Sequence, residues 1–178
     1  MEQKVDKIMF QIDDIMVHKA YFMLTAKLMV DHLYKEGKID EAKELLRRAC
    51  VHDNSKIRSD EFNCLTQMSC DKQSFTNSNS TLSDADRKLV ELHWQHNSHH
   101  PEHYENYDDM SEMDVIEMVC DWFSRSCQYG TSLIDFFETR HTNRFHFSEE
   151  MYNKIMRYCT IIVLLERENP IKIIFEKE

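Results

Sequence analysis

Glycine and proline are scarce in this chain, and their scarcity constrains the fold more than any other feature. Each occurs only twice in 178 residues. Proteins built of β-strands need many tight turns, and these turns depend on both residue types. Hydrophobic residues make up 42% of the chain, which is enough to form a core. We therefore expect an all-α protein, with residues 1–178 forming a single domain of about 6–7 helices.

Apolar residues recur at helical spacing along most of the chain. The expected helices cover residues 5–34 (as one helix or two in sequence), 41–50, 60–68, a stretch that begins at 84, 112–127, 132–140 and 149–166. Residues 69–83 are polar and of low complexity, which is typical of a surface loop. Residues 169–178 begin with Asn-Pro and form a C-terminal tail that does not simply continue the last helix.

Capping residues mark the ends of several of these helices. The expected N-caps are Asp40, Ser83, Ser111 and Ser148, because short polar side chains accept hydrogen bonds from the first free backbone N–H groups. Gly37 and Gly130 are expected just beyond helix C-termini, where a left-handed residue is common.

The charge and the lack of long apolar segments restrict the partners. The net charge of −10 disfavours binding to long nucleic acid, but a small anionic substrate remains compatible because a bound cation reverses the local potential. The longest apolar run, TIIVLL, is too short to cross a membrane, and the first residues have no secretory pattern. Six cysteines without a CxxC pair indicate reduced thiols. We expect a cytoplasmic protein of a bacterium or of a phage-infected cell, and the sequence leaves a homodimer open.

Histidines concentrate in one segment. The sequence HWQHNSHHPEHY, at residues 93–104, holds five of the ten histidines of the chain. His93 and His96 are three residues apart, so they can face the same way on a helix. His99 and His100 precede a proline, which disfavours helical geometry, so we expect them in the loop after that helix. This arrangement makes the segment a candidate metal-binding region.

An adjacent histidine and aspartate follow the second expected helix. The segment VHDNSK contains His52, Asp53 and Lys56. Adjacent residues on one helix point about 100° apart, so the pair reaches one ion only beyond the helix edge or where the backbone bends. The residues DNS favour such a bend. By itself, the pair is equally compatible with a capping aspartate beside a surface histidine.

Three further residues lie in strongly apolar helical segments. His18 is a candidate ligand, with a core histidine bonded to a backbone carbonyl as the alternative. Glu117 and Asp121 are four residues apart within VIEMVCDWF, which is apolar nearly all round and therefore predicted to be buried. A buried carboxylate needs a cation, either an Arg or Lys side chain or a metal ion. We expect Asp121 to bind a metal and Glu117 to orient a ligand imidazole.

Imidazole and carboxylate ligands suit a divalent transition metal such as Mn, Fe, Zn, Ni or Co better than Ca or Mg. The order of the motifs resembles the HD-domain superfamily of metal-dependent phosphohydrolases, in which a His, an adjacent His-Asp and a later Asp bind one ion. His18, His52, Asp53 and Asp121 match that set. The resemblance implies an HD-like helical bundle. The pattern also looks like a small family of phage and bacterial HD-like proteins.

Two shorter motifs extend the resemblance. The segment HDNSK resembles the family's HDxGK, which places Lys56 at a lysine that contacts substrate phosphate. The segment HHPE is similar to the HHxE of the branch that hydrolyses cyclic dinucleotides. That similarity implies a second metal ion held by His99 and His100 together with His93 or His96. The resemblance therefore implies one or two ions.

These features predict a metal-dependent phosphohydrolase that acts on a nucleotide, a cyclic nucleotide or another small phosphoester through a metal-activated water. Lys56 is expected to neutralise phosphate charge, and Glu117, Glu61 or a histidine of the cluster to transfer the proton. Two alternatives remain open. One is an HD-type oxygenase with two iron ions, and the other is a non-enzymatic protein of the same fold that binds a metal or a nucleotide.

Overall fold

The computed structural model describes residues 2–58, 61–62 and 84–171. Within these ranges the chain forms six α-helices and no strand, so the all-α prediction is confirmed. The helices are α1 (Glu2–Lys35), α2 (Ile39–Val51), α5 (Asp84–His96), α6 (Glu112–Tyr129), α7 (Leu133–Arg140) and α8 (Glu149–Glu168). None of the helices in this part of the chain is long and apolar enough to cross a bilayer. The predicted surface loop at 69–83, the Ser83 cap and most of the predicted helix at 60–68 lie outside the described residues.

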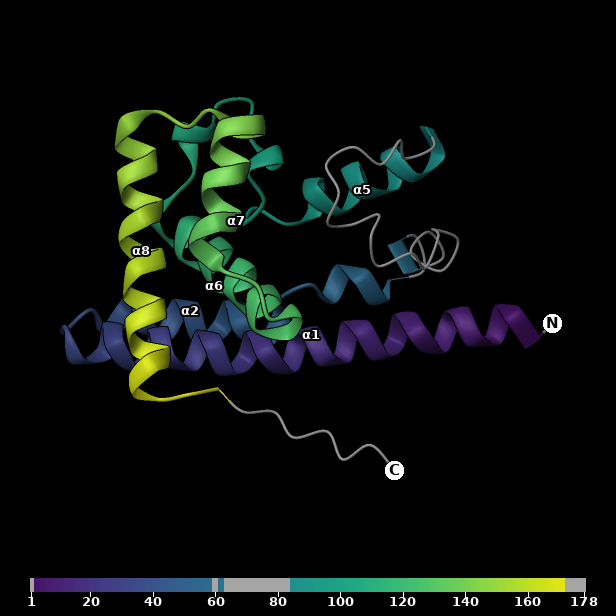
Figure 1. Ribbon diagram of the computed structural model, residues 1–178, viewed down its shortest axis with the longest axis horizontal. Helices are drawn as coiled ribbons and strands as arrows, with labels where there is room; N and C mark the ends of the chain where they lie inside the picture. The colour runs from purple at the N-terminus through teal and green to yellow at the C-terminus, as the bar shows by residue number, and fades with distance from the viewer. Residues whose placement is uncertain (1, 59–60, 63–83, 172–178) are drawn as a thin grey trace.

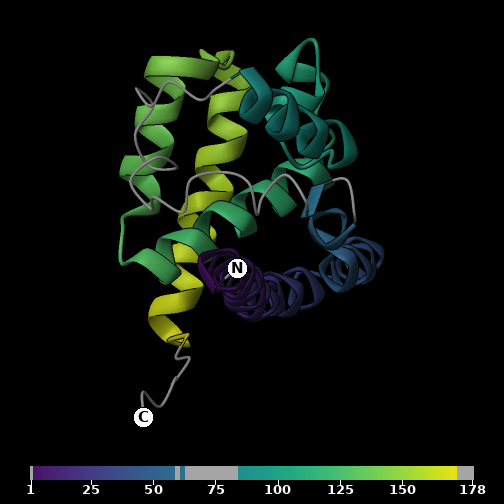
Figure 2. The same ribbon diagram turned by 90° about the vertical axis from the view of Figure 1, so that its right-hand side faces the viewer.

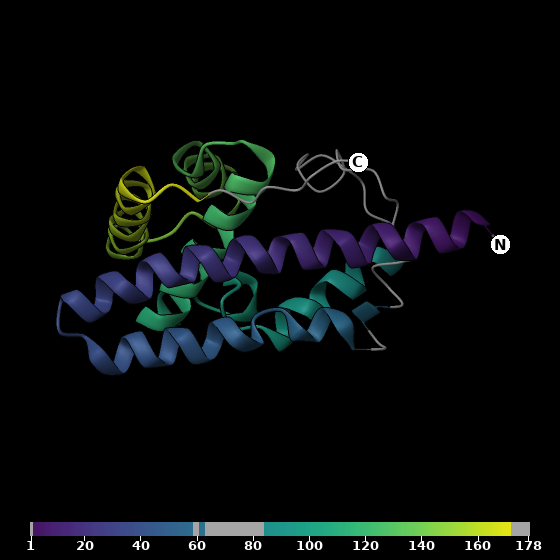
Figure 3. The same ribbon diagram turned by 90° about the horizontal axis from the view of Figure 1, so that it is seen from below.

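The helices surround α6, which runs through the middle of the molecule (Figure 1). Helix α1 is a single long helix along one edge, and α2 returns antiparallel beside it (Figure 3). Figure 2 looks along α1 and shows α7 and α8 on one side and α2 and α5 on the other. Helix α1 packs chiefly against α2 and α6, while α8 packs against α6 and α1. This arrangement brings residues of α1, α2 and α6 to a common interior.

Helix α6 is buried nearly all round, as its apolar sequence predicts. Twelve of its residues are buried, among them the two carboxylates Glu117 and Asp121. Its core neighbours include Phe22 and Met29 of α1 and Leu45 of α2. Because the interior around α6 is otherwise apolar, its buried carboxylates need specific polar partners.

Four of the expected caps are confirmed and one is wrong. The hydroxyls of Ser111 and Ser148 accept hydrogen bonds from backbone N–H groups at the starts of α6 and α8. Gly37 and Gly130 follow α1 and α6 in the left-handed conformation, with φ of 78° and 67°. Asp40 does not cap α2, because that helix already begins at Ile39 with Lys38 in the capping position. The Asp40 carboxylate instead lies in the first turn, where negative charge favours the helix dipole.

Candidate metal centre

Seven side chains from distant parts of the sequence converge beside α6. They are His18 of α1, His52 and Asp53 at the end of α2, His93 of α5, His99 and His100 in the loop after α5, and Asp121 of α6. We call these seven residues the His–Asp centre. Helix α5 ends at His96, so the expectation that the histidine segment spans a helix end and the following loop is confirmed.

The backbone bends sharply where α2 delivers its two residues. The helix ends at Val51, His52 has the extended values φ −49° and ψ 129°, and Asp53 is left-handed with φ of 55°. Aspartate is among the few residues that adopt this conformation readily. The predicted bend is confirmed, and it lets the adjacent side chains of His52 and Asp53 reach the same interior.

The first ligand set is formed by His18, His52, Asp53 and Asp121, all of them buried. Nε2 of His18 lies 2.9 Å from Oδ1 of Asp121 and 3.4 Å from Oδ2 of Asp53. Nε2 of His52 lies 3.6 Å from Oδ1 of Asp121 and 3.5 Å from Oδ2 of Asp53. Ligand atoms about 2.1 Å from a tetrahedral ion are roughly 3.4 Å apart, so this set has the dimensions of a metal site.

The second ligand set is formed by Asp53, His93, His99 and His100. Oδ1 of Asp53 lies 3.4 Å from Nε2 of His93 and 3.7 Å from Nε2 of His99. Nε2 of His100 lies 3.0 Å from Nε2 of His93. Asp53 therefore belongs to both sets, with Oδ2 facing the first and Oδ1 facing the second.

Among the described residues, four buried atoms of the centre make no hydrogen bond of good geometry. They are Nε2 of His18, Nε2 of His52, Nε2 of His99 and Oδ1 of Asp53. A buried polar atom without a hydrogen bond costs about 1–3 kcal/mol. The first two atoms belong to the first set and the last two to the second, so an ion in each set would satisfy all four. The residues present therefore fit a divalent transition metal, since nitrogen and oxygen ligands of this kind are the ones it prefers.

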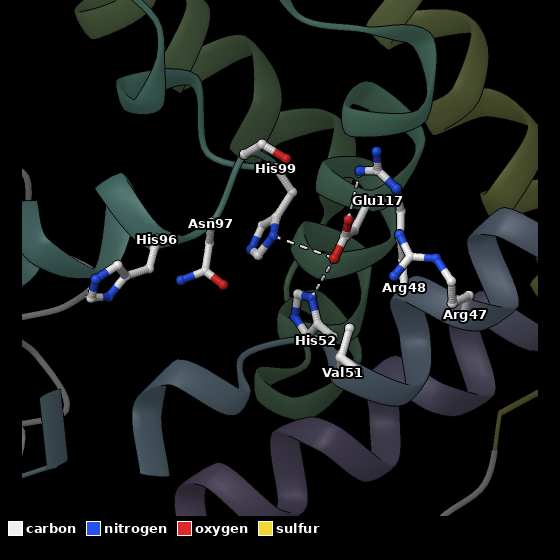
Figure 4. Close-up of a pocket in the computed structure, with 9 residues that line it drawn as sticks. Arg47, Arg48, Val51, His52, His96, Asn97, His99 and Glu117 are labelled. Atoms are coloured by element: carbon white, nitrogen blue, oxygen red, sulfur yellow. Dashed lines mark hydrogen bonds and ion pairs between the residues drawn. The ribbon is translucent and has the colours of Figure 1, made fainter. Parts of the chain in front are cut away.

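Glu117 lies behind two of the ligand imidazoles. Its Oε1 is 3.0 Å from Nδ1 of His52 and 3.4 Å from Nδ1 of His99 (Figure 4). Its Oε2 accepts a hydrogen bond of 3.1 Å from Arg48. Since the carboxylate contacts the Nδ1 edges, it leaves both Nε2 atoms facing the centre, as a residue that orients ligand histidines does.

Glu61 occupies a similar position behind the second set. Its Oε2 lies 2.8 Å from Nδ1 of His93 and also accepts a 2.9 Å hydrogen bond from Ser55. Its Oε1 lies 2.6 Å from Nδ1 of His96. His96 was expected among the ligands, but the structure places it in neither set. His96 lies about one helical turn after His93 on α5, and its Nδ1 contacts Oε1 of Glu61 instead.

Lys56 contacts the shared carboxylate. Its Nζ donates a short hydrogen bond to Oδ2 of Asp53, and its side chain retains 14% exposure. Burial raises the pKa of Asp53, but Lys56 and the imidazole of His52 outweigh burial and hold that pKa well below its usual range. Asp53 is therefore a carboxylate in the described structure, which is the form that binds metal ions.

The pKa values of His52 and His100 shift in opposite directions. Burial favours neutral His52, but nearby carboxylates, with Asp53 the strongest, raise its pKa to about 9. Burial and then the charges of His99 and His93 hold the pKa of His100 well below its usual range. Neutral imidazole is the form that coordinates a metal, so His100 would bind an ion without losing a proton, whereas His52 would have to release one.

A pocket opens on the outer side of Glu117 (Figure 4). It is lined by Arg47, Arg48, Val51, His52, His96, Asn97, Ser98, His99 and Glu117. The pocket therefore reaches the Nδ1 side of the ligand histidines and gives solvent a path to the carboxylate that orients them.

Sequence reasoning did not single out two residues that support the centre. Phe22 stacks flat on the ring of His52, with centroids 3.5 Å apart and an interplanar angle of 3°. Arg48 binds Glu117 and Asp114. Helical spacing carries a signal for each of them, because Phe22 follows His18 by four residues and Arg48 precedes His52 by four.

The fold and the site together define an all-α protein with a buried cluster of histidines and carboxylates that could hold a metal ion. The chain belongs to the family of unknown function DUF5662, which matches residues 7–161. No curated protein and no solved structure matched the chain in the corresponding comparisons.

Proposed function

We propose that this chain is a metal-dependent phosphohydrolase of the HD type, acting on a nucleotide, a cyclic nucleotide or another small phosphoester. One observation carries the proposal: among the described residues, four buried atoms of the two ligand sets, around the carboxylate that both sets share, make no hydrogen bond of good geometry. Carboxylates and imidazoles that are arranged only for folding are expected to satisfy one another by well-aligned hydrogen bonds. Here Nε2 of His18 lies 2.9 Å from Oδ1 of Asp121 and still makes no such bond, as expected of atoms placed around an ion.

The residues of the two sets have the charge that a divalent ion neutralises. Asp53 and Asp121 contribute two negative charges to the first set, in a position where neither is exposed to bulk water. A bound divalent ion lowers the pKa of a coordinated water and neutralises phosphoryl oxygens, which is the chemistry that phosphoester hydrolysis requires. His18 and His52 supply the two nitrogen ligands of that set.

Lys56 is the candidate contact for substrate phosphate. Its ammonium group already lies against the carboxylate of Asp53, and its side chain is partly exposed at the edge of the centre. An ammonium there neutralises an incoming phosphate that competes for it. The overall charge of −10 makes this local cation more important for an anionic substrate and disfavours a long polyanion.

Glu61 and Glu117 have a structural part in this proposal. Both carboxylates contact Nδ1 atoms, so they lie on the far side of the imidazoles from the ligand atoms. This position favours orientation of the rings over transfer of a proton to or from substrate, although both residues were candidates for proton transfer. When an ion fills the first set alone, His93 and His100, whose Nε2 atoms lie 3.0 Å apart, are better placed for that role.

The test combines metal analysis with hydrolysis. Purified protein is analysed for bound Mn, Fe, Co, Ni and Zn, and is then assayed on bis(p-nitrophenyl) phosphate and on a panel of nucleotides and cyclic nucleotides. His52→Ala and Asp53→Ala should lose both metal and turnover. His103→Ala is the matched control, because His103 is exposed and its Nδ1 faces the carbonyl of Trp94 instead of the centre. Absence of transition metal in the wild type refutes the proposal.

One observation also favours a second candidate. Two ligand sets joined by one carboxylate could hold two iron ions, and a pair of irons can activate dioxygen. Iron content of two per chain, with substrate turnover that stops under nitrogen, favours the oxygenase. Bound metal without turnover of any phosphoester or dioxygen favours a non-enzymatic protein that binds metal or nucleotide.

A further inference from the structure

Arg48 lies on α2 one helical turn before His52 and is surrounded by carboxylates. Its Nη1 donates to Oδ1 of Asp114 over 2.7 Å and to Oε2 of Glu117 over 3.1 Å. Its Nε donates to Oε1 of Glu44 over 2.9 Å. The side chain is only 20% exposed, so these charge-assisted hydrogen bonds are shielded from water.

The partner Glu117 reaches both ligand sets. The oxygen that does not bind Arg48 faces Nδ1 of His52, a ligand of the first set, and Nδ1 of His99, a ligand of the second. Rotation of this carboxylate changes both contacts at once. Arg48 holds the opposite oxygen and so limits that rotation.

The other partner, Asp114, fixes the loop that carries His99. Its Oδ1 also accepts a 2.6 Å hydrogen bond from the hydroxyl of Ser98, the residue before His99. Its Oδ2 accepts a 2.8 Å hydrogen bond from the hydroxyl of Tyr104. Arg48 therefore contacts two carboxylates, one of which orients the His99 ring while the other anchors the backbone beside it.

We propose that Arg48 is a positioning residue of the His–Asp centre, which orients one histidine of each ligand set by fixing the carboxylate of Glu117. This inference rests on the proposed metal site and extends it to a residue that contacts no ligand atom of the centre. Three carboxylates accept hydrogen bonds from Nε and Nη1 of Arg48 and neutralise its charge, which disfavours an anionic substrate at this side chain. A planar guanidinium suits the role because it donates in two directions at fixed angles, which a lysine ammonium does not.

The neighbouring arginine provides a matched control. Arg47 also pairs with Glu44, through Nε at 2.8 Å and Nη2 at 2.7 Å, and it lines the same pocket. Its side chain is exposed, and in the described structure its ion pair is with Glu44 rather than with Glu117 or Asp114. Arg47→Met removes the same charge from the same helix and leaves Glu117 held.

The experiment titrates metal-free protein with Co²⁺. The d–d absorption of bound Co²⁺ reports the number and geometry of the ligands, and competition with a chelator gives the affinity. Arg48→Met should weaken Co²⁺ binding by about 10–100-fold and alter the spectrum, which is the usual effect of removing a group that orients ligands. Arg47→Met should change the affinity by less than about twofold. Arg48→Lys, which keeps the charge, should fall between wild type and Arg48→Met.

The unfolding midpoint of each metal-free variant separates positioning from loss of fold. If Arg48→Met does not fold, Arg48→Lys is compared with an Arg47→Lys control in the same titration. Wild-type Co²⁺ affinity and spectrum in the folded Arg48 variants overturn this inference alone. No Co²⁺ binding by the wild type overturns the proposed function and this inference with it. If the wild type binds Co²⁺ but turns over no phosphoester, the proposed hydrolase is overturned, while weaker Co²⁺ binding by Arg48→Met still supports the positioning role.

Discussion

The shared carboxylate of Asp53 leads to a prediction that separates one metal site from two. Asp53→Asn removes the charge that both ligand sets use, whereas Asp121→Asn removes a ligand from the first set alone. Asparagine has nearly the same shape as aspartate and also tolerates the left-handed backbone at position 53. Both variants should therefore fold, and they should differ in how strongly metal stabilises them.

The size of the effect follows from linkage between binding and folding. At a free concentration of 100 times the dissociation constant, one bound ion stabilises the folded state by about 2.7 kcal/mol. In a chain of this length, 1 kcal/mol changes the melting temperature by about 2–4 °C. One occupied set should therefore raise Tm by roughly 5–11 °C, and two occupied sets by about twice as much.

Thermal unfolding after chelation and after addition of Mn²⁺ or Co²⁺ measures these shifts. Wild type should show the full increase in Tm, Asp121→Asn about half of it, and Asp53→Asn almost none. The control His103→Ala should behave as wild type. An Asp53→Asn variant with the full metal-dependent increase would refute the reasoning, because the carboxylate would then not be shared by the two sets.

Three further predictions concern single residues. Phe22→Ala should destabilise the chain by about 3–5 kcal/mol in urea unfolding, because a fully buried ring that stacks on His52 leaves a cavity; a loss below 1 kcal/mol contradicts this. Burial raises the pKa of Asp14, but the nearby Arg125 guanidinium lowers it by more, so the pKa lies below its usual value. The Asp14–Arg125 ion pair should stabilise the metal-free fold above about pH 4. This stabilisation should be lost as the pH falls through the lowered pKa that Asp14 has in the folded protein. Asp14→Asn should flatten that part of the stability profile, and an unchanged slope argues against the pair. Gly130→Ala should cost about 1 kcal/mol because φ is 67°, and equal stability in urea excludes that strain.

Helical periodicity and chain order carry much of the information about the centre. His18 and Asp121 were candidates because each interrupts an apolar helical pattern, and a buried polar group requires a partner. His52 was a candidate because it adjoins Asp53 at the end of a helix. The bend at Asp53 could be predicted because the residues DNS favour it. These signals are local or depend only on spacing, so one sequence is enough to read them.

Side-chain contacts between residues far apart in the sequence could not be predicted in the same way. The pairing of Glu61 with both His93 and His96 depends on where the chain returns after position 58, and no periodicity encodes that distance. For the same reason His96 looked like a ligand from its spacing to His93 alone. Arg48 resembled any basic residue in the last turn of a helix, where a cation is common without further meaning.

The left-handed conformation of Asp53 also limits how this site can change its chemistry. At φ of 55° the backbone accepts glycine, asparagine or aspartate, while glutamate or cysteine costs about 1–2 kcal/mol in addition to the changed ligand. Among the residues that fit this backbone, only aspartate can offer a charged oxygen to each set. A shift in metal preference, by evolution or by design, therefore has to act through the histidines or Asp121, with Asp53 as the fixed point of the centre.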